Sequence, residues 1–93
     1  SQKVSFENTP NPATLKFHLG QVVTDSGFEC TNAQEAEKSP LATKIFGFPW
    51  TSSVFVGTDF ITVTKQDWVD WAVLAQPLAN LIQEHMSNQE PVV

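Results

Sequence analysis

The sequence predicts an α+β fold, a two-layer sandwich in which two helices cover one face of a mainly antiparallel sheet of four to five strands. Three observations support this class: short runs of alternating apolar and polar residues, a glycine-containing loop between two such runs, and two stretches with helical spacing of apolar residues. The predicted order is two or three strands, a helix, a hairpin and a helix. A chain of 93 residues suits one domain, which we place at residues 1–87, followed by a frayed tail at 88–93.

A proline-containing arm separates the first two predicted strands. The first strand covers roughly Lys3–Glu7, where apolar and polar residues alternate. The arm contains Pro10 and Pro12, which fix φ near about −65° and remove two backbone donors, so we expect a stiff, non-helical segment. The second strand then ends at Gly20, and its apolar positions are Leu15, Phe17 and Leu19.

The next segment carries weaker signals. Val22 and Val23 predict a short edge strand, and Asp25-Ser26-Gly27 is typical of a turn. A helix-friendly stretch over Asn32–Lys38 is rich in glutamate and alanine.

A helix start is predicted at Ser39-Pro40, with serine as the N-cap and proline at the first helical position. Leu41, Ile45 and Phe46 share one face at helical spacing. Gly47 can end this helix.

A β-hairpin gives the strongest local signal. Two β-rich runs within Ser53–Thr64 flank the short loop Gly57-Thr58-Asp59. In the second run, Ile61 and Val63 lie on one face, so this strand has one buried side.

The last predicted element is a helix that begins near Asp67 or Asp70. Its apolar residues follow the rhythm of a helix that packs on a core. Pro77 lies inside the pattern and predicts a kink, or a split into two helical parts.

Charge and composition exclude several functional classes. The net charge is −5, there is no arginine and the five lysines are scattered, so we expect no nucleic-acid partner. No apolar run approaches the roughly 20 residues of a membrane helix, so we expect no membrane partner. The chain begins without the apolar segment of a secretory signal, and we expect a cytoplasmic, reducing compartment.

Cys30 is the only cysteine, so no disulfide can form within the chain. Iron–sulfur clusters usually take four cysteine ligands. We therefore expect no cofactor held by this chain alone, and iron or a cluster only with ligands from a partner. His18 and His85 could contribute to such a shared site, but no metal ligand is assigned.

Four ordered blocks of the sequence resemble the Nfu/NifU-like N-terminal domain. They span roughly positions 6 to 86. They are TPNPATLKF (9–17), SPLATKIF (39–46), SVFVGTDFITVTK (53–65) and Asp70-Trp71 before a proline-containing helix.

The resemblance implies a role in iron–sulfur cluster assembly. Usual members of the family are two-domain scaffolds or carriers whose second domain holds the cluster on a Cys-x-x-Cys motif, which this sequence lacks. Their N-terminal domain is associated with partner recognition and with iron binding. We therefore expect a non-enzymatic, monomeric binding module that docks to a carrier or to an apo target. A general protein or peptide adaptor and a weak ferrous-iron-binding protein remain alternatives.

We predict partner contacts at the arm and at the neighbouring strands, since a rigid arm loses little entropy on binding. An enzyme is the weakest hypothesis, because no nucleophile and base can be paired from the sequence. The predicted contact residues are Asn11, Pro12, Lys16, Phe17, Asp59 and Phe60.

Overall fold

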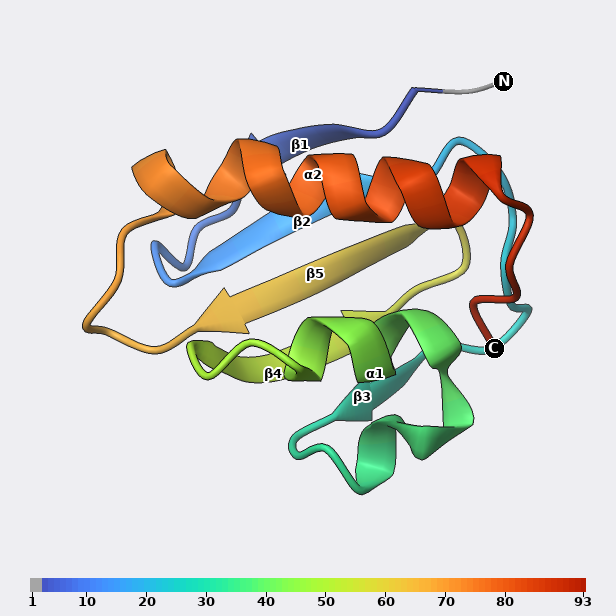
Figure 1. Cartoon of the computed structure of the whole chain (residues 1–93), viewed down its shortest axis with the longest axis horizontal. Coiled ribbons are helices and arrows are strands. Elements are labelled where there is room, and N and C mark those ends of the chain that lie inside the picture. The colour runs from blue at the N-terminus through green and yellow to red at the C-terminus, as the bar shows by residue number, and fades with distance from the viewer. Residues whose placement is uncertain (1–2) are drawn as a thin grey trace.

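The computed structural model describes residues 3–93 and confirms the α+β class (Figure 1). Five antiparallel strands form one sheet in the order β1-β2-β5-β4-β3, and both helices lie on the same face of it. The elements in chain order are β1 (Ser5–Asn8), β2 (Thr14–His18), β3 (Phe28–Cys30), the 3₁₀ helix η1 (Glu35–Lys38), α1 (Pro40–Phe46), β4 (Thr51–Val56), β5 (Phe60–Lys65) and α2 (Trp71–Ser87).

The core lies between the sheet and the helices. In the register of β2 with β5, Leu15 pairs with Val63 and Phe17 pairs with Ile61, and all four side chains are buried. Because side chains alternate across a strand, the residues between them point to the opposite face of the sheet. α2 buries Leu78, with Ala75 and Ile82, against this core.

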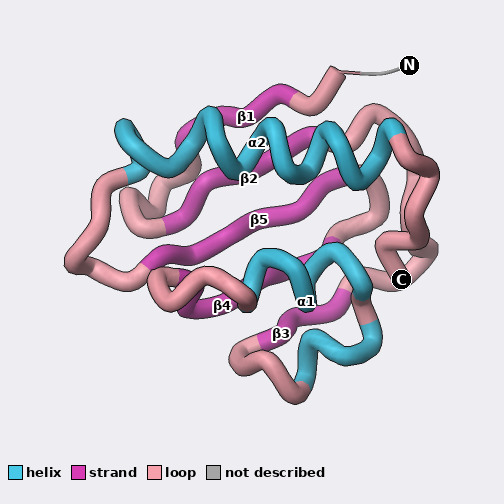
Figure 2. The backbone as a smooth tube through the Cα atoms, viewed as in Figure 1, coloured by secondary structure: helices cyan, strands magenta, loops and turns pink. Residues whose placement is uncertain are grey.

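α1 starts as the sequence predicts, and α2 starts after Asp70, the second of its two predicted starts. The Ser39 side chain accepts a hydrogen bond from the Ala42 amide, and Asp70 caps α2 through the Ala72 amide. α2 is one continuous helix, so the alternative in which Pro77 splits it is wrong (Figure 2). Pro77 lies on the exposed side, and core packing before and after it holds the helix together.

Two segments differ from the prediction. Val22 and Val23 form no strand; Val22 is 74% exposed, and the edge strand is instead β3, whose Cys30 pairs with Val54. The helix-friendly stretch over 32–38 forms only the short η1.

The C-terminal tail, expected to be frayed, packs against α1 and α2. Val92 is buried, and its carbonyl accepts a hydrogen bond from the Ser39 hydroxyl at 2.5 Å. His85 Nε2 lies 2.9 Å from the Pro91 carbonyl, and the Lys44 ammonium donates to Glu90 at 3.1 Å. The tail residues therefore contact the rest of the fold. The domain boundary at residue 87 stays a prediction.

Candidate functional site

The predicted contact residues do not form one surface. Phe17 is fully buried on the helix side of the sheet, with its ring 5.8 Å from that of Phe6 and 6.1 Å from that of Trp71. It is a core residue, so a partner cannot reach its side chain. The alternation along β2 places its neighbour Lys16 on the opposite face.

Asn11 and Pro12 are exposed at the turn between β1 and β2. Backbone amides of Thr14 and Ala13 donate to the Asn11 carbonyl and to its Oδ1, at 2.9 and 3.0 Å. The Trp71 indole donates to the Ala13 carbonyl at 3.0 Å, which ties the turn to the start of α2. The arm is therefore held rigidly, as its prolines predict.

Asp59 is exposed at the β4–β5 loop. Figure 1 places this loop and the β1–β2 turn at opposite ends of the sheet. The Asp59 carbonyl accepts a hydrogen bond from the Leu19 amide at 3.0 Å, so the loop is bonded to the segment that follows β2. Asp59 and Asn11 thus belong to separate surfaces.

Lys16 and Phe60 meet on the sheet face that no helix of residues 3–93 covers. The Lys16 ammonium lies 4.4 Å from the centre of the Phe60 ring, and the Phe55 ring lies 6.0 Å from that of Phe60. We call the surface around them the open sheet face; its residues are Glu7, Lys16, His18, Phe55, Phe60 and Thr62. A cation over an aromatic face is a favourable contact of about 0.5–1 kcal/mol at exposed sites.

Two glycines fix the rings of the open sheet face. A Cβ on Gly57 would come within 2.4 Å of the Phe60 ring, and one on Gly27 within 2.9 Å of the Phe55 ring. Both rings therefore lie directly over glycine backbone, where any larger residue would displace them. The site is preorganised by these contacts.

Acidic groups flank the aromatic centre. His18 Nε2 lies 2.5 Å from Glu7 Oε1 on the β1 side, and Glu29 pairs with Phe55 in the β3–β4 register. Across residues 3–93, no group of three or more His, Cys, Asp or Glu side chains is placed to hold a metal ion. The arrangement sets the Lys16 ammonium and the Phe60 ring between these acidic groups.

Cys30 lies on β3 with no exposed surface. Burial raises the pKa of its thiol, and the nearby Lys38 charge opposes this effect only in part. The thiol therefore has neither the exposure nor the thiolate character of a ready cluster ligand.

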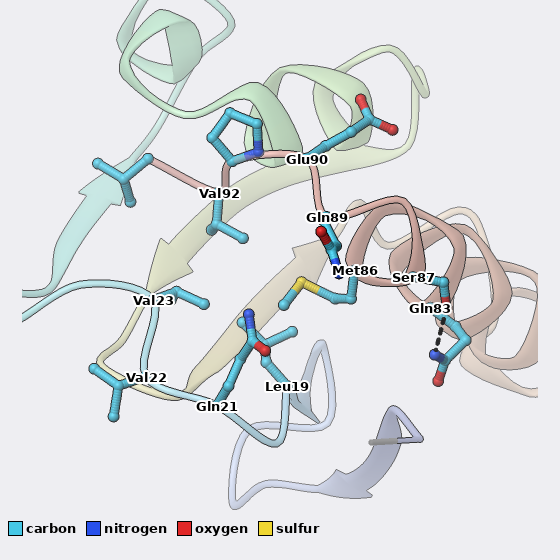
Figure 3. A pocket seen from close by; sticks show the side chains of 12 residues that line it. Leu19, Gln21, Val22, Val23, Gln83, Met86, Ser87, Gln89, Glu90 and Val92 are labelled. Carbon is cyan, nitrogen blue, oxygen red and sulfur yellow. Dashed lines mark hydrogen bonds between the residues drawn. The ribbon is translucent and has the colours of Figure 1, made fainter. Parts of the chain in front are cut away.

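A separate pocket of about 650 Å³ opens between the segment after β2, the end of α2 and the tail (Figure 3). Leu19, Val23, Met86 and Val92 face it, and Val22 stands at its exposed rim. None of the predicted contact residues lines this pocket. Within the described part of the chain, no helix is long and apolar enough to cross a membrane.

The family model described as "Scaffold protein Nfu/NifU N terminal" matches residues 4–89. The chain belongs to the Nfu/NifU N-terminal family. The resemblance seen in the four sequence blocks is therefore confirmed.

Two curated relatives show the sequence identity and the share of each chain that is covered. The chain is 36% identical to NifU-like protein 5, mitochondrial, of Arabidopsis thaliana, over 96% of this chain and 33% of that protein. It is 39% identical to NifU-like protein C1709.19c of Schizosaccharomyces pombe, over 94% of this chain and 35% of that protein. The chain thus spans about a third of the length of these relatives, as a Nfu/NifU N-terminal domain would.

Solved structures share the fold. The solution structure of a NifU-like protein from Saccharomyces cerevisiae superposes with a TM-score of 0.81 at 27% identity, covering 100% of this chain and 87% of that one. A Staphylococcus epidermidis protein superposes with a TM-score of 0.59 at 27% identity, covering 90% of this chain and 98% of that one.

Sequence reasoning missed Phe55, Gly27 and Gly57 as parts of the site. The signal for Gly57 is its position three residues before Phe60 in the hairpin, where a ring can fold back over the loop. Phe55 and Gly27 come together only through the pairing of β3 with β4, which no local pattern encodes.

Proposed function

We propose that this Nfu/NifU N-terminal domain is a docking module for proteins of iron–sulfur cluster assembly or transfer, and that the open sheet face is its contact surface. The observation that carries the proposal is the Lys16–Phe60–Phe55 cluster on the uncovered face of the sheet. Membership of the Nfu/NifU scaffold family supports an iron–sulfur protein as the partner, and we propose a cluster carrier or an apo target.

The physical properties of the cluster suit recognition. Buried aromatic anchors carry most of the binding free energy in protein interfaces. The two rings lie on glycine backbone before any partner arrives, so little side-chain entropy is lost on binding. Lys16 adds a charge that a carboxylate of the partner can neutralise.

The arm and Asp59 are predicted as secondary contacts. Asn11 and Pro12 lie at one end of the sheet and Asp59 at the other. A partner centred on the open sheet face would reach one of these ends and not necessarily both. The chain acts here as a monomer, in a compartment that keeps thiols reduced.

The experiment measures the affinity of the chain, under anaerobic conditions, for a cluster-loaded Cys-x-x-Cys Nfu domain and for an apo iron–sulfur acceptor protein. Phe60→Ala and Lys16→Glu should each weaken binding at least about 10-fold, or about 1.4 kcal/mol. Val22→Glu is the control, since Val22 is 74% exposed at the distant pocket. Unchanged affinity in both sheet-face variants contradicts the proposal.

The same titrations separate the alternatives. A general adaptor would bind neither iron–sulfur protein, and its interactions would not respond to iron or oxygen. A ferrous-iron-binding protein would show saturable uptake of ferrous iron by the chain alone. The docking module shows selective binding to a cluster protein and no such uptake.

A further inference from the structure

The outer face of α2 is unusual for a surface helix because it carries no charge. Between Asp70 and Glu84 the sequence contains no Asp, Glu, Lys, Arg or His, although a surface helix normally presents charged residues to solvent. Depletion of charge is the compositional mark of the centre of a protein interface. We call this surface the α2 outer face; its residues are Ala72, Val73, Gln76, Pro77 and Asn80, and all are exposed.

Two large apolar side chains are exposed in this part of the chain, Val73 on α2 and Trp68 in the turn before the helix. Trp68 is 63% exposed and Val73 is 71% exposed. Trp50 and Trp71, in contrast, are each only 8% exposed and pack in the core with their rings 5.8 Å apart. Tryptophan is among the residues most enriched at binding hot spots, so an exposed one two residues before the N-cap of α2 favours a contact surface at this end of the helix.

Pro77 adds a polar group to the same face. Proline has no amide hydrogen, so the Val73 carbonyl lacks the donor that residue i+4 normally supplies in a helix. The side chain of Val73 is 71% exposed, so this carbonyl can accept a hydrogen bond from a partner.

A groove next to the α2 outer face has mixed walls, since Lys44, Glu84 and His85 line it together with Pro77, Asn80 and Leu81. Its volume is about 430 Å³, and it lies between α1 and α2. Leu81 is half-buried in its wall, beside Pro77 and Asn80.

The charges at the two ends of the face decide what can cover it. Asp67 and Asp70 are exposed at the start of α2, where Lys65 is the one nearby cation in sequence. Glu84 and Glu90 stand at the other end, where the Lys44 ammonium is already paired with Glu90. Each end is therefore net acidic.

These acidic ends argue against a second copy of the chain and against a membrane. Two α2 helices packed together would bring acidic ends onto acidic ends in either the parallel or the antiparallel orientation, and like charges opposed across an interface are unfavourable. An anionic lipid surface would be repelled in the same way. A foreign surface with basic residues at matching positions would be attracted.

We propose that the α2 outer face docks a helix of a partner protein that carries an apolar stripe with Lys or Arg at both ends. Asp70 and Glu84 are separated by four turns of helix, about 21 Å, which sets the spacing of the two basic positions. This surface lies on the helix side of the sandwich and the open sheet face on the other side. The proposal therefore stands whether or not the sheet face binds iron–sulfur proteins.

The test uses the full chain and two synthetic helical peptides that carry the same apolar stripe. Each peptide has about 18 residues, because at the rise of an α-helix this length spans the distance between Asp70 and Glu84. One peptide has lysines about 14 positions apart at its ends, and the other has glutamates there. Trp68 fluorescence reports binding, since the other two indoles are already buried. The lysine peptide should shift the emission to shorter wavelength with saturation, and the glutamate peptide should bind at least about 10-fold more weakly.

Val73→Glu should weaken binding of the lysine peptide at least about 10-fold, and the equally exposed Val22→Glu should not change it. Both variants are first compared with the unmodified chain by thermal unfolding. The proposal is overturned if the lysine peptide shows no saturable binding, if both peptides bind equally, or if the two valine variants behave alike. A dimer that light scattering detects and that depends on Val73 would overturn the proposal in favour of a second copy of the chain. A shift of Trp68 emission with lipid vesicles alone would overturn it in favour of a membrane.

Discussion

Adjacent residues of β2 have opposite roles at the scale of the single residue. Lys16 lies on the open sheet face over the Phe60 ring, and Phe17 lies in the core under α2. A substitution of Lys16 should therefore change partner binding, and a substitution of Phe17 should change the stability of the fold.

Phe17→Ala should lower the free energy of unfolding by about 3–5 kcal/mol, because it removes a buried ring and leaves a cavity. Urea unfolding measures the change. Phe60→Ala is the matched control, since its ring is only half-buried on the open sheet face, and it should cost clearly less. A loss below about 1 kcal/mol for Phe17→Ala would contradict its place in the core.

Cys30 gives a second prediction. Burial raises the pKa of its thiol, so the native chain should react with iodoacetamide much more slowly than the chain in denaturant. Intact-mass measurement over time follows the reaction. Equal rates in the native and the unfolded chain would show that the thiol is accessible and would reopen a role as a cluster ligand.

The alternation of apolar and polar residues along the second strand already separates Lys16 from Phe17 in the sequence. The prediction of Phe17 as a contact treats the arm and the strand as one surface and neglects this alternation. The Lys16–Phe60 contact, by contrast, depends on the pairing of β2 with β5, and a sequence pattern offers no way to see it.

At the scale of elements, Ser39 connects the start of α1 to the C-terminal tail. Its hydroxyl accepts from the Ala42 amide at 3.1 Å and donates to the Val92 carbonyl at 2.5 Å, and the residue is fully buried. One side chain thus caps a helix and anchors the tail.

Ser39→Ala should destabilise the chain by about 1–2 kcal/mol, because the helix cap is lost and the Val92 carbonyl loses its donor. Denaturant unfolding measures the change, and exchange of the Glu90 amide, which donates to the His85 carbonyl at 3.2 Å, should become faster as the tail loosens. Ser26→Ala, at an exposed turn, is the control. If exchange at Glu90 stays unchanged, the hydroxyl does not anchor the tail.

The pairing of Lys44 with Glu90 predicts a response of the tail to acid. The hydrogen bond from the Lys44 ammonium lowers the pKa of the Glu90 carboxyl below its ordinary 4.5. A carboxyl with a lowered pKa in the folded state contributes stability above the ordinary value, and this contribution is lost as the pH falls through the lowered value.

Tail resonances around Glu90 should therefore shift toward unstructured positions below pH 4.5, as followed by NMR across a pH series. Lys44→Met removes the donor and should abolish this transition. A transition of the same size in that variant would exclude the ion pair as its cause.

Elements with local signals are predicted well from the sequence. The hairpin and the starts of both helices follow from turn and cap residues such as Gly57, Ser39 and Asp70. β3 and the packed tail escape prediction because they depend on distant partners: Cys30 on β3 pairs with Val54, and Val92 contacts Ser39.

At the scale of the whole molecule, the sandwich separates two surfaces of different character. The open sheet face carries aromatic rings and a lysine, and the α2 outer face on the other side is uncharged between acidic ends. The molecule extends over 32 × 27 × 22 Å, so its thickness keeps the two surfaces apart. We expect that occupation of one surface leaves the other free.

The most direct test of the central claim is an NMR titration of the ¹⁵N-labelled chain with a cluster-loaded Cys-x-x-Cys Nfu domain and with an apo iron–sulfur acceptor, under anaerobic conditions. We expect saturable shifts for at least one of them, concentrated at Lys16, Phe55, Phe60 and Thr62. Shifts confined to the α2 outer face or to the β1–β2 turn, or no shifts with either protein, would contradict docking through the open sheet face.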